Sequence, residues 1–206
     1  MFIKNDKPVQ IIGFPQSSGT QEVLEVFYKE GLNNVGVIEP QHFFDLHNKK
    51  QFQYIVSSIL DLSLRRSICD KIDSLNLDCV TYINDSVYVF DSAIIGKGCY
   101  IGYKCILSWN CVVGDHCFLG IGSQLGHDSI LGKNCVLAPD AAITGRTTVG
   151  ENCKFFWRSS VLNNLQVCDN VTLGALSNIT KSVNVPGNYV GSIARLMKPK
   201  PTDKDP

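Results

Sequence analysis

Every sixth residue from Ile83 to Val185 is large and apolar, namely Val, Ile or Leu at all positions except Phe155. The residue two positions before each is small in most of these hexads, and glycine often follows the large residue. A period of six matches neither the 3.6-residue period of a helix nor the alternation of an ordinary strand. It is typical of a hexapeptide β-helix, in which each hexad forms one short strand and one turn.

The hexad also predicts where side chains point. Residues two apart on an extended strand face the same side, so the large and the small residue of each hexad both face inward. Three hexads make one triangular coil, and residues 18 apart then stack on one another. About six such coils, spaced by about 4.8 Å, form a parallel prism roughly 29 Å long.

Most of the cysteines fall into this frame. Six of the nine occupy the small inward position, and this favours a packing role over metal binding or redox chemistry: Cys99, Cys105, Cys111, Cys117, Cys135 and Cys153. The two histidines of the prism, His116 and His127, are too few and wrongly spaced for a metal held by about three histidines. The sequence therefore predicts no metal site and reduced thiols, as in a cytoplasmic protein.

Charge excludes two classes of partner. Nineteen Lys and Arg residues balance 19 Asp and Glu residues, so no broad basic field exists to attract nucleic acid or an anionic membrane. No segment approaches the roughly 20 apolar residues of a membrane span, and residues 1–6 do not resemble a signal peptide. We expect neither nucleic acid nor membrane as a partner.

Residues 1–80 lack the hexad and alternate between strand and helix patterns. Residues 9–13, 35–38 and 54–56 are predicted strands, and an apolar stripe over 64–75 predicts a helix. This alternation indicates a small α/β unit with a parallel sheet, resembling half of a Rossmann fold. The predicted domains are thus an α/β unit (1–80), a β-helix (81–190) and a C-terminal tail (191–206).

The loop from Gly13 to Gly19 precedes a predicted helix. Backbone N–H groups converge at a helix N-terminus and can hold phosphate, although the loop could equally be an ordinary connection. Ser18 and Gln21 have the spacing of a capping box, which predicts Ser18 as the N-cap and leaves Ser17 as the better ligand contact.

His127 lies two residues after Leu125, outside the inward pair and at a coil corner, and Asp128 follows it. An exposed imidazole beside a carboxylate can be a general base of fixed orientation, or the two can simply be solvated corner residues. Gly145 comes one coil later, within about one strand spacing of His127, where its N–H would be open to a bound carbonyl.

The segment His127–Gly132 resembles the His-(Asp/Glu)-x-x-(Ile/Leu)-Gly motif of bacterial sugar O-/N-acyltransferases. These include the sialic acid O-acetyltransferases and the N-acetyltransferases of the bacillosamine and perosamine pathways. The resemblance covers roughly residues 8–198 and implies a left-handed β-helix and a homotrimer. It also implies acetyl-CoA as donor, bound in the groove between neighbouring prisms.

The resemblance also implies roles for individual residues. It makes His127 the general base, Asp128 its partner, and the Gly145 amide the contact to the thioester carbonyl. Gly191–Arg195 corresponds to the family segment beside the adenine and places Ala194 and Arg195 there. The family binds its nucleotide sugar at the first loop, which here contains Gly13, Ser17 and Ser18.

The departures from the family concern the acceptor. The first loop has no histidine, Gly120 stands where the family often has Asn, and Gly191–Arg195 lacks the family's proline. Phe155–Arg158 also replaces a hexad that is usually small and contains glycine. His127, Asp128 and Gly145 therefore match the family better than the segments that are expected to bind the substrate.

The expected function is acetyl-CoA-dependent N-acetylation of a nucleotide-linked amino sugar, by direct transfer with a His general base, in surface glycan biosynthesis. One alternative is O-acetylation of a free sugar such as a sialic acid. The other is a trimeric scaffold without catalysis, against which the spacing of His127, Asp128 and Gly145 speaks.

Overall fold

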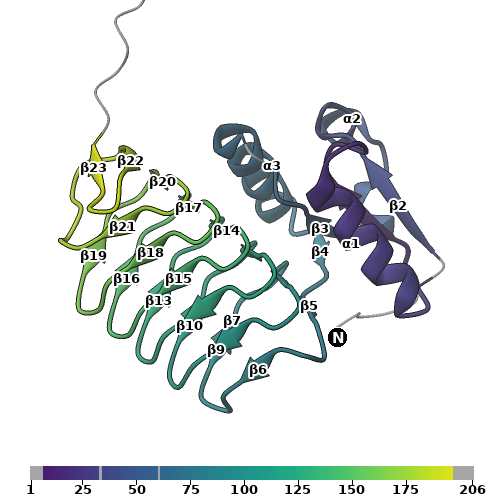
Figure 1. Ribbon diagram of the computed structural model, residues 1–206. Helices are drawn as coiled ribbons and strands as arrows, with labels where there is room; N and C mark the ends of the chain where they lie inside the picture. Colours follow the sequence, from purple (N-terminus) through teal and green to yellow (C-terminus); the bar gives the residue numbers. More distant parts are fainter. Residues whose placement is uncertain (1–6, 33, 60, 197–206) are drawn as a thin grey trace, which may run out of the picture.

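The computed structural model describes residues 7–32, 34–59 and 61–196. It has two parts, an α/β unit at the N-terminal end and a three-sided prism of stacked coils (Figure 1). The prism fits a left-handed parallel β-helix of about six coils, so the expected fold class is confirmed.

The α/β unit contains a parallel four-stranded sheet of order β2-β1-β3-β4. Its strands are β1 (Val9–Ile12), β2 (Val35–Ile38), β3 (Gln53–Val56) and β4 (Asp78–Cys79). The connections contain α1 (Ser18–Lys29), α2 (Pro40–Asp45), the short 3-10 helix η1 (Lys49–Gln51) and α3 (Leu62–Ser74). The sequence patterns had indicated α1, α3 and three of the strands, but neither α2 nor η1.

The prism has three faces, each a sheet. The first face is eight-stranded and consists of β5 (Tyr82–Ile83), β8 (Tyr100–Ile101), β11 (Phe118–Leu119), β14 (Val136–Leu137), β17 (Lys154–Phe155), β20 (Val171–Leu173), β22 (Gly187–Val190) and β23 (Arg195–Leu196). The second face is six-stranded and consists of β6 (Tyr88–Val89), β9 (Ile106–Leu107), β12 (Gln124–Leu125), β15 (Ala142–Ile143), β18 (Ser160–Val161) and β21 (Asn178–Ile179). The third face is five-stranded and consists of β7 (Ile94–Ile95), β10 (Val112–Val113), β13 (Ile130–Leu131), β16 (Thr148–Val149) and β19 (Gln166–Val167).

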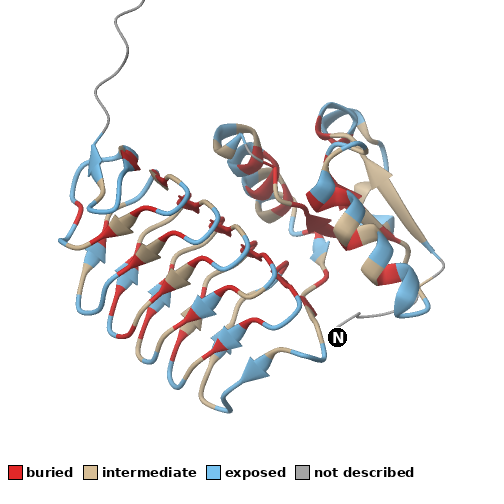
Figure 2. Cartoon of the chain, in the orientation of Figure 1, coloured by how far each residue is buried: buried red, intermediate tan, exposed pale blue. Residues whose placement is uncertain are grey.

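The inside of the prism is filled as the hexad predicts. Leu125 pairs with Ile143 one coil later, and the inward residues of the middle coils are buried (Figure 2). All six cysteines of the small inward position are fully buried, and all nine cysteines are free. The Cys117 thiol lies 3.2 Å from the carbonyl oxygen of Gly132, which supports a packing role for this position.

The hexad predicts the wrong inward residue in the last coil of the prism. Val185 was expected inside, but 48% of it is exposed. Val183 takes the inward place instead: it forms a bridge with Val167, and its N–H donates to the Gln166 carbonyl at 2.7 Å. The last coil is therefore two residues shorter than the others, which the apolar period alone does not reveal.

The α/β unit packs against the first face of the prism. The outward rings of Tyr82, Tyr100 and Phe118 stack at centroid distances of 5.4 and 4.7 Å. Phe27 of α1 lies 5.5 Å from the Tyr82 ring, and these side chains belong to one buried cluster. Aromatic packing thus fixes α1 against the coils that contain β5, β8 and β11.

A polar contact fixes α3 to the neighbouring corner. Asp73 accepts hydrogen bonds from His116 at 3.0 Å and from Lys97 at 2.7 Å. The fully buried Arg65 donates to the side chain of Asn134 and to the Ser57 carbonyl. Burial alone would raise the pKa of the Asp73 carboxyl, but the hydrogen bonds from His116 and Lys97 outweigh it and lower this pKa.

This contact gives a pH-dependent prediction. A carboxyl whose pKa is lowered on folding stabilises the protein at neutral pH and loses that contribution as the pH falls below about 4. Asp73→Asn should therefore lower the free energy of unfolding by about 1 kcal/mol at pH 7, and the difference from wild type should shrink towards about pH 3. Urea unfolding at several pH values measures this. Asp70→Asn is the control, because the ion pair of Asp70 with Arg66 on the same helix is exposed; a pH-independent effect of Asp73→Asn would contradict the assignment.

Candidate active site

His127 lies at the corner where the chain passes from β12 on the second face to β13 on the third face. Its Nδ1 lies 2.8 Å from Oδ2 of Asp128, and 46% of the imidazole side chain is exposed. With Asp128 as a carboxylate, Nδ1 is the protonated nitrogen that donates, and Nε2 carries the free lone pair. This is the tautomer that a general base requires.

Asp128 is held in place by the coil beneath it. It adopts a left-handed backbone conformation (φ 56°), its N–H donates to the Trp109 carbonyl at 2.9 Å, and Asn110 Nδ2 lies 3.4 Å from its Oδ1. The hydrogen bond from His127 lowers the pKa of the Asp128 carboxyl, so it stays ionised beside the imidazole. Sequence reasoning missed Asn110, although its position 18 residues before Asp128 could have identified it.

Gly145 lies directly against the imidazole. A Cβ atom at this position would come within 2.6 Å of His127 Nε2 and 2.9 Å of Cδ2, so only glycine fits against the ring in this position. In the described ranges, no group accepts a hydrogen bond from the Gly145 N–H. The structure thus brings a free basic nitrogen and an open backbone donor together, as the 18-residue stacking predicted.

A shallow depression of about 210 Å³ adjoins Gly145 on the second face, lined by Ser108, Gln124 and Thr144 among others. The outward residues above it are small or polar as far as Asn178 of β21. Ala194 donates its N–H to the Asn178 carbonyl at 2.8 Å, and the exposed Arg195 follows. Asn178 lies in β21, three coils or about 14 Å above β12, so Ala194 contacts the upper end of the second face.

The first loop corrects the expected helix cap. The N-cap of α1 is Ser17, not Ser18: Ser17 Oγ accepts from the Thr20 N–H at 3.2 Å and contacts Thr20 Oγ1 at 2.8 Å. A turn in which the Ser17 N–H donates to the Phe14 carbonyl ends the loop one residue earlier than expected. The Ser17 hydroxyl is thus engaged in the cap, and Ser18 becomes the better candidate for a ligand contact.

Gly13 and Ser18 lie where open α/β sheets bind ligands. In the order β2-β1-β3, helix connections leave β1 and β3 in opposite directions, and a crevice opens at their carboxyl ends. Gly13 ends β1, where a Cβ would come within 2.2 Å of Ser57 Oγ. The topology therefore places Gly13 and Ser18 beside this crevice.

A cavity of about 200 Å³ joins this crevice to the first face of the prism. Ser18, Glu22 and Ser58 line it from the α/β unit. The prism contributes Gly120, together with the side chains of Phe118, Val136, Lys154 and Phe156, among others. Sequence reasoning missed Glu22 and Lys154; the departure of the hexad around Phe155 from the family pattern was the only signal.

The cavity and His127 lie at different corners of the same prism. Gly120 follows β11 at the corner between the first and second faces, whereas His127 follows β12 at the next corner. In the ranges that the structure describes, no group of three or more His, Cys, Asp or Glu side chains is arranged to hold a metal ion, and no helix has the length and apolar character of a membrane span.

Comparison with known proteins supports the family resemblance. The model of the bacterial transferase hexapeptide (six repeats) matches residues 110–145, which include His127, Asp128 and Gly145. No curated protein is similar enough in sequence to match the chain.

Solved structures are similar over almost the whole chain. PerB from Caulobacter crescentus, in complex with CoA and GDP-perosamine, is 20% identical over 94% of this chain and 99% of its own, with a TM-score of 0.78. The acetyltransferase domain of PglB from Neisseria gonorrhoeae, in complex with acetyl coenzyme A, is 21% identical over 94% and 100%, with a TM-score of 0.80. WeeI from Acinetobacter baumannii is 17% identical over 92% and 99%, with a TM-score of 0.78. The shared feature at this identity is the fold, with both the α/β unit and the prism.

Proposed function

We propose that the protein transfers the acetyl group of acetyl-CoA directly to the amine of a nucleotide-linked amino sugar. The observation that carries the proposal is the placement of His127 Nε2 over Gly145, while Nδ1 donates to Asp128. Nε2 takes the proton from the amine as its nitrogen bonds to the thioester carbonyl carbon, and Asp128 stabilises the resulting imidazolium. The C–S bond then breaks, and CoA leaves as its thiol with the proton that Nε2 had taken. The Gly145 N–H donates to the carbonyl oxygen as that oxygen becomes negative, a contribution of about 3 kcal/mol in other enzymes.

The second face offers a path for the donor. Acetyl-CoA supplies the acetyl group as a thioester, and the depression beside Gly145 would hold that end of the molecule. Ala194 and Arg195 would lie beside the adenine at the upper end of the prism, where the chain passes from its contact with β21 of the second face to β23 of the first face. CoA is bound in PerB, and acetyl-CoA in the PglB domain, which support this assignment on the same fold.

The acceptor would occupy the cavity between α1 and the first face. Ser18 lines this cavity at the N-terminus of α1, which favours a phosphate-bearing ligand there, and Gly13 follows β1 at the adjoining crevice. PerB binds GDP-perosamine with a fold of the same two parts, which supports a nucleotide-linked amino sugar. We place the reaction in the cytoplasm, as a step of surface glycan biosynthesis.

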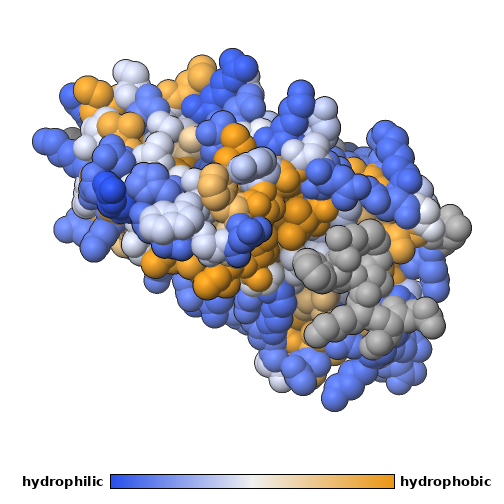
Figure 3. Space-filling model, turned by 90° about the horizontal axis from the view of Figure 1, so that it is seen from below, coloured by the Kyte–Doolittle hydropathy of each residue, from blue (hydrophilic) through white to orange (hydrophobic). Residues whose placement is uncertain are grey.

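A homotrimer would complete the site. Because the cavity and His127 lie at different corners of one prism, the acceptor needs the imidazole of a neighbouring copy. The faces and the corner beside His127 expose large apolar side chains: Ile94, Ile106, Trp109 and Ile130. Figure 3 shows apolar surface gathered on the underside of the molecule. Such a surface is typical of a protein interface.

The proposed function is tested by incubating the purified protein with acetyl-CoA and a panel of nucleotide amino sugars, the corresponding free amino sugars and sialic acid. Release of CoA thiol and the mass of the product identify the acceptor and the acetylated atom. An amide product from a nucleotide amino sugar is the expected result. An ester product from a free sugar would favour the O-acetyltransferase alternative, and no product from any acceptor would favour the scaffold.

Ser18→Arg should raise the KM of the nucleotide amino sugar by at least about tenfold, because the longer side chain enters the cavity at the helix N-terminus. The KM of acetyl-CoA should change little, since its proposed groove lies on another face. The matched control is Ser17→Ala, which removes the helix cap and should cost about 1 kcal/mol of stability without raising the acceptor KM. The opposite pattern, with only Ser17→Ala raising the acceptor KM, would restore the original assignment of Ser17.

A further inference from the structure

The lower end of the prism, at its first coil (residues 81–98), is open. In the described part of the chain, β5, β6 and β7 of this coil are each the last strand of their sheet (Figure 1). The inward side chains of Ile83, Val89 and Ile95 are therefore not fully buried, and 36% of Val89 is exposed. The residues that pair with them one coil higher are at most 1% exposed: Ile101, Leu107 and Val113.

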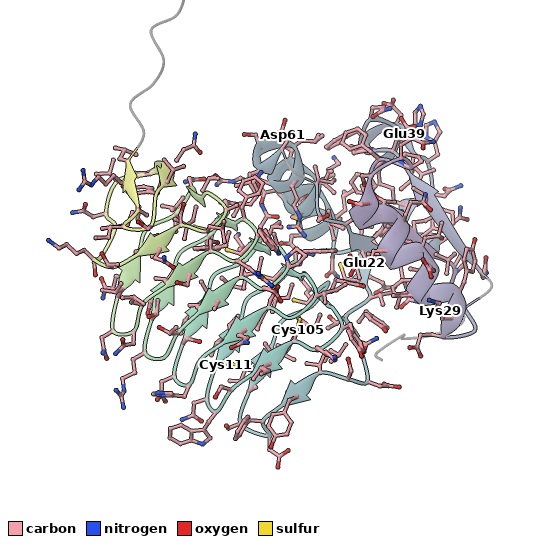
Figure 4. The ribbon with its side chains drawn as sticks, in the orientation of Figure 1. Glu22, Lys29, Glu39, Asp61, Cys105 and Cys111 are labelled. Atoms are coloured by element: carbon pink, nitrogen blue, oxygen red, sulfur yellow. The ribbon has the colours of Figure 1, made fainter. Side chains whose placement is uncertain are left out.

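A cavity of about 590 Å³ occupies this lower end. Apolar side chains from all three faces line it: Ile83, Val89, Ala93 and Ile95. One coil higher the interior is filled by Cys105 and Cys111, which lie 18 residues after Val87 and Ala93 (Figure 4). The cavity thus lies where the side chains of a further coil would pack, and the end of a solenoid needs such a cover for solubility.

Residues 1–6 lie outside the described ranges, and the residue that follows them is fixed close to this cavity. Lys7 pairs through Nζ with Oδ2 of Asp78, and the residue after Asp78, Cys79, lines the cavity. Lys7 precedes β1, whereas Asp78 lies in β4, two strands or about 9.6 Å away in the order β1-β3-β4. Five extended residues span about 17 Å, so position 2 can reach the cavity from Lys7.

The composition of residues 1–6 suits this lining. Phe2 and Ile3 are large and apolar, and Lys4 follows them. The turns of the first coil present Asp85 and Asp91, which are exposed and can attract this cation. Because the segment belongs to the same chain, its effective concentration at the cavity is in the millimolar range, which favours it over a free ligand or a second copy.

We propose that residues 1–6 close the lower end of the prism, with the side chains of Phe2 and Ile3 in the cavity. This placement removes apolar surface of both the segment and the first coil from water, which is its main driving force. It also keeps the edges of β5, β6 and β7 from pairing with another copy of the chain. The inference goes beyond the proposed function and does not depend on it, because the cavity shares no residue with the candidate active site.

The first test places a photoreactive benzoylphenylalanine at position 2 of the full chain, in place of Phe2. Irradiation should link it to the cavity lining of the same chain, so that the product keeps the mass of one chain on a denaturing gel and mass spectrometry finds the link at Ile83, Val89 or Ile95. The matched control carries the same group in place of Tyr28, an exposed aromatic residue of α1, and should give no such link. Links between two chains would assign the cavity to a second copy, and links only elsewhere would place the segment elsewhere; either result would overturn the proposal.

A second measurement follows the binding of an apolar naphthalene dye. Phe2→Asp should raise the affinity for the dye at least about tenfold, because a carboxylate is costly to bury and leaves the cavity open. Asn5→Asp is the matched control: it adds the same charge at a polar position of the segment, and its affinity should stay within about twofold of wild type. An affinity of Phe2→Asp within about twofold of wild type would overturn the proposal.

Two further observations keep the dye result specific. Far-UV circular dichroism of Phe2→Asp should match wild type, and if it does not, the photochemical test decides alone. Native mass spectrometry of wild type should show the mass of the chain without a bound apolar molecule, and such a molecule would assign the cavity to a free ligand and overturn the proposal. Neither test uses acetyl-CoA or an acceptor, so a failure of the proposed function leaves this inference intact.

Discussion

Replacing His127 by asparagine should lower the turnover of acetyl transfer by about 10²–10⁴-fold, the usual contribution of a general base. Asparagine can still contact Asp128, but it has no nitrogen that accepts a proton near neutral pH. The side chain is half exposed at a corner, so the prism should fold as before. Steady-state rates of CoA thiol release, measured with the acceptor found in the substrate panel, give this ratio directly.

Two comparisons make the His127 result specific. His127→Asn should keep the assembly state and melting temperature of wild type, so that lost activity is not lost fold. Asp128→Asn should be less damaging, because this residue orients the imidazole and does not itself take the proton. Turnover of His127→Asn within about threefold of wild type would remove His127 from the catalytic role.

Gly145→Ala should lower turnover by at least about 100-fold, comparable to the loss of an oxyanion-stabilising donor elsewhere. The added methyl group would come within 2.6 Å of His127 Nε2, so the ring must move from its position. The same methyl group would cover the open N–H that the proposed oxyanion needs. One small substitution thus disturbs both the base and the donor.

A double substitution separates this mechanism from general damage. If Gly145→Ala acts largely by displacing the imidazole, adding it to His127→Asn should lower turnover by much less than it does in wild type. Circular dichroism and the unfolding midpoint should change little, because the side chain that must move to make room for the methyl group, His127, is half exposed. Fully additive losses would show that the alanine acts elsewhere and not through His127.

The sequence by itself determined the prism and the corner at which His127 meets Asp128 and Gly145. The hexad is a local pattern, and each repeat sets which side chains face inward without reference to distant residues. Stacking at 18 residues then follows from three hexads per coil, and it brings Gly145 to His127 because both lie on one such ladder. The pairing of His127 with Asp128 is also local, since adjacent residues at a corner need no tertiary information to meet.

The predictions from sequence patterns were wrong at two places, the last coil of the prism and the start of α1. Val185 kept the apolar period but lies outside, because the last coil is two residues shorter. The cap of α1 fell on Ser17 because the turn of the loop, and not the spacing to Gln21, decided where the helix begins.

Only the tertiary structure decided which outward side chains of the prism are covered and which stay exposed. Outward positions are not constrained by the period, so nothing in the hexad distinguishes Lys154, which is buried, from Gln124 and Thr148, which hold the same place in other hexads and are exposed. The difference arises because the α/β unit packs on the first face, through Phe27, Tyr82 and Tyr100, and encloses a cavity beside Lys154. The contacts around this cavity join segments more than 100 residues apart and depend on this packing. The corner at His127 could therefore be predicted from the sequence, whereas the cavity proposed for the acceptor could not.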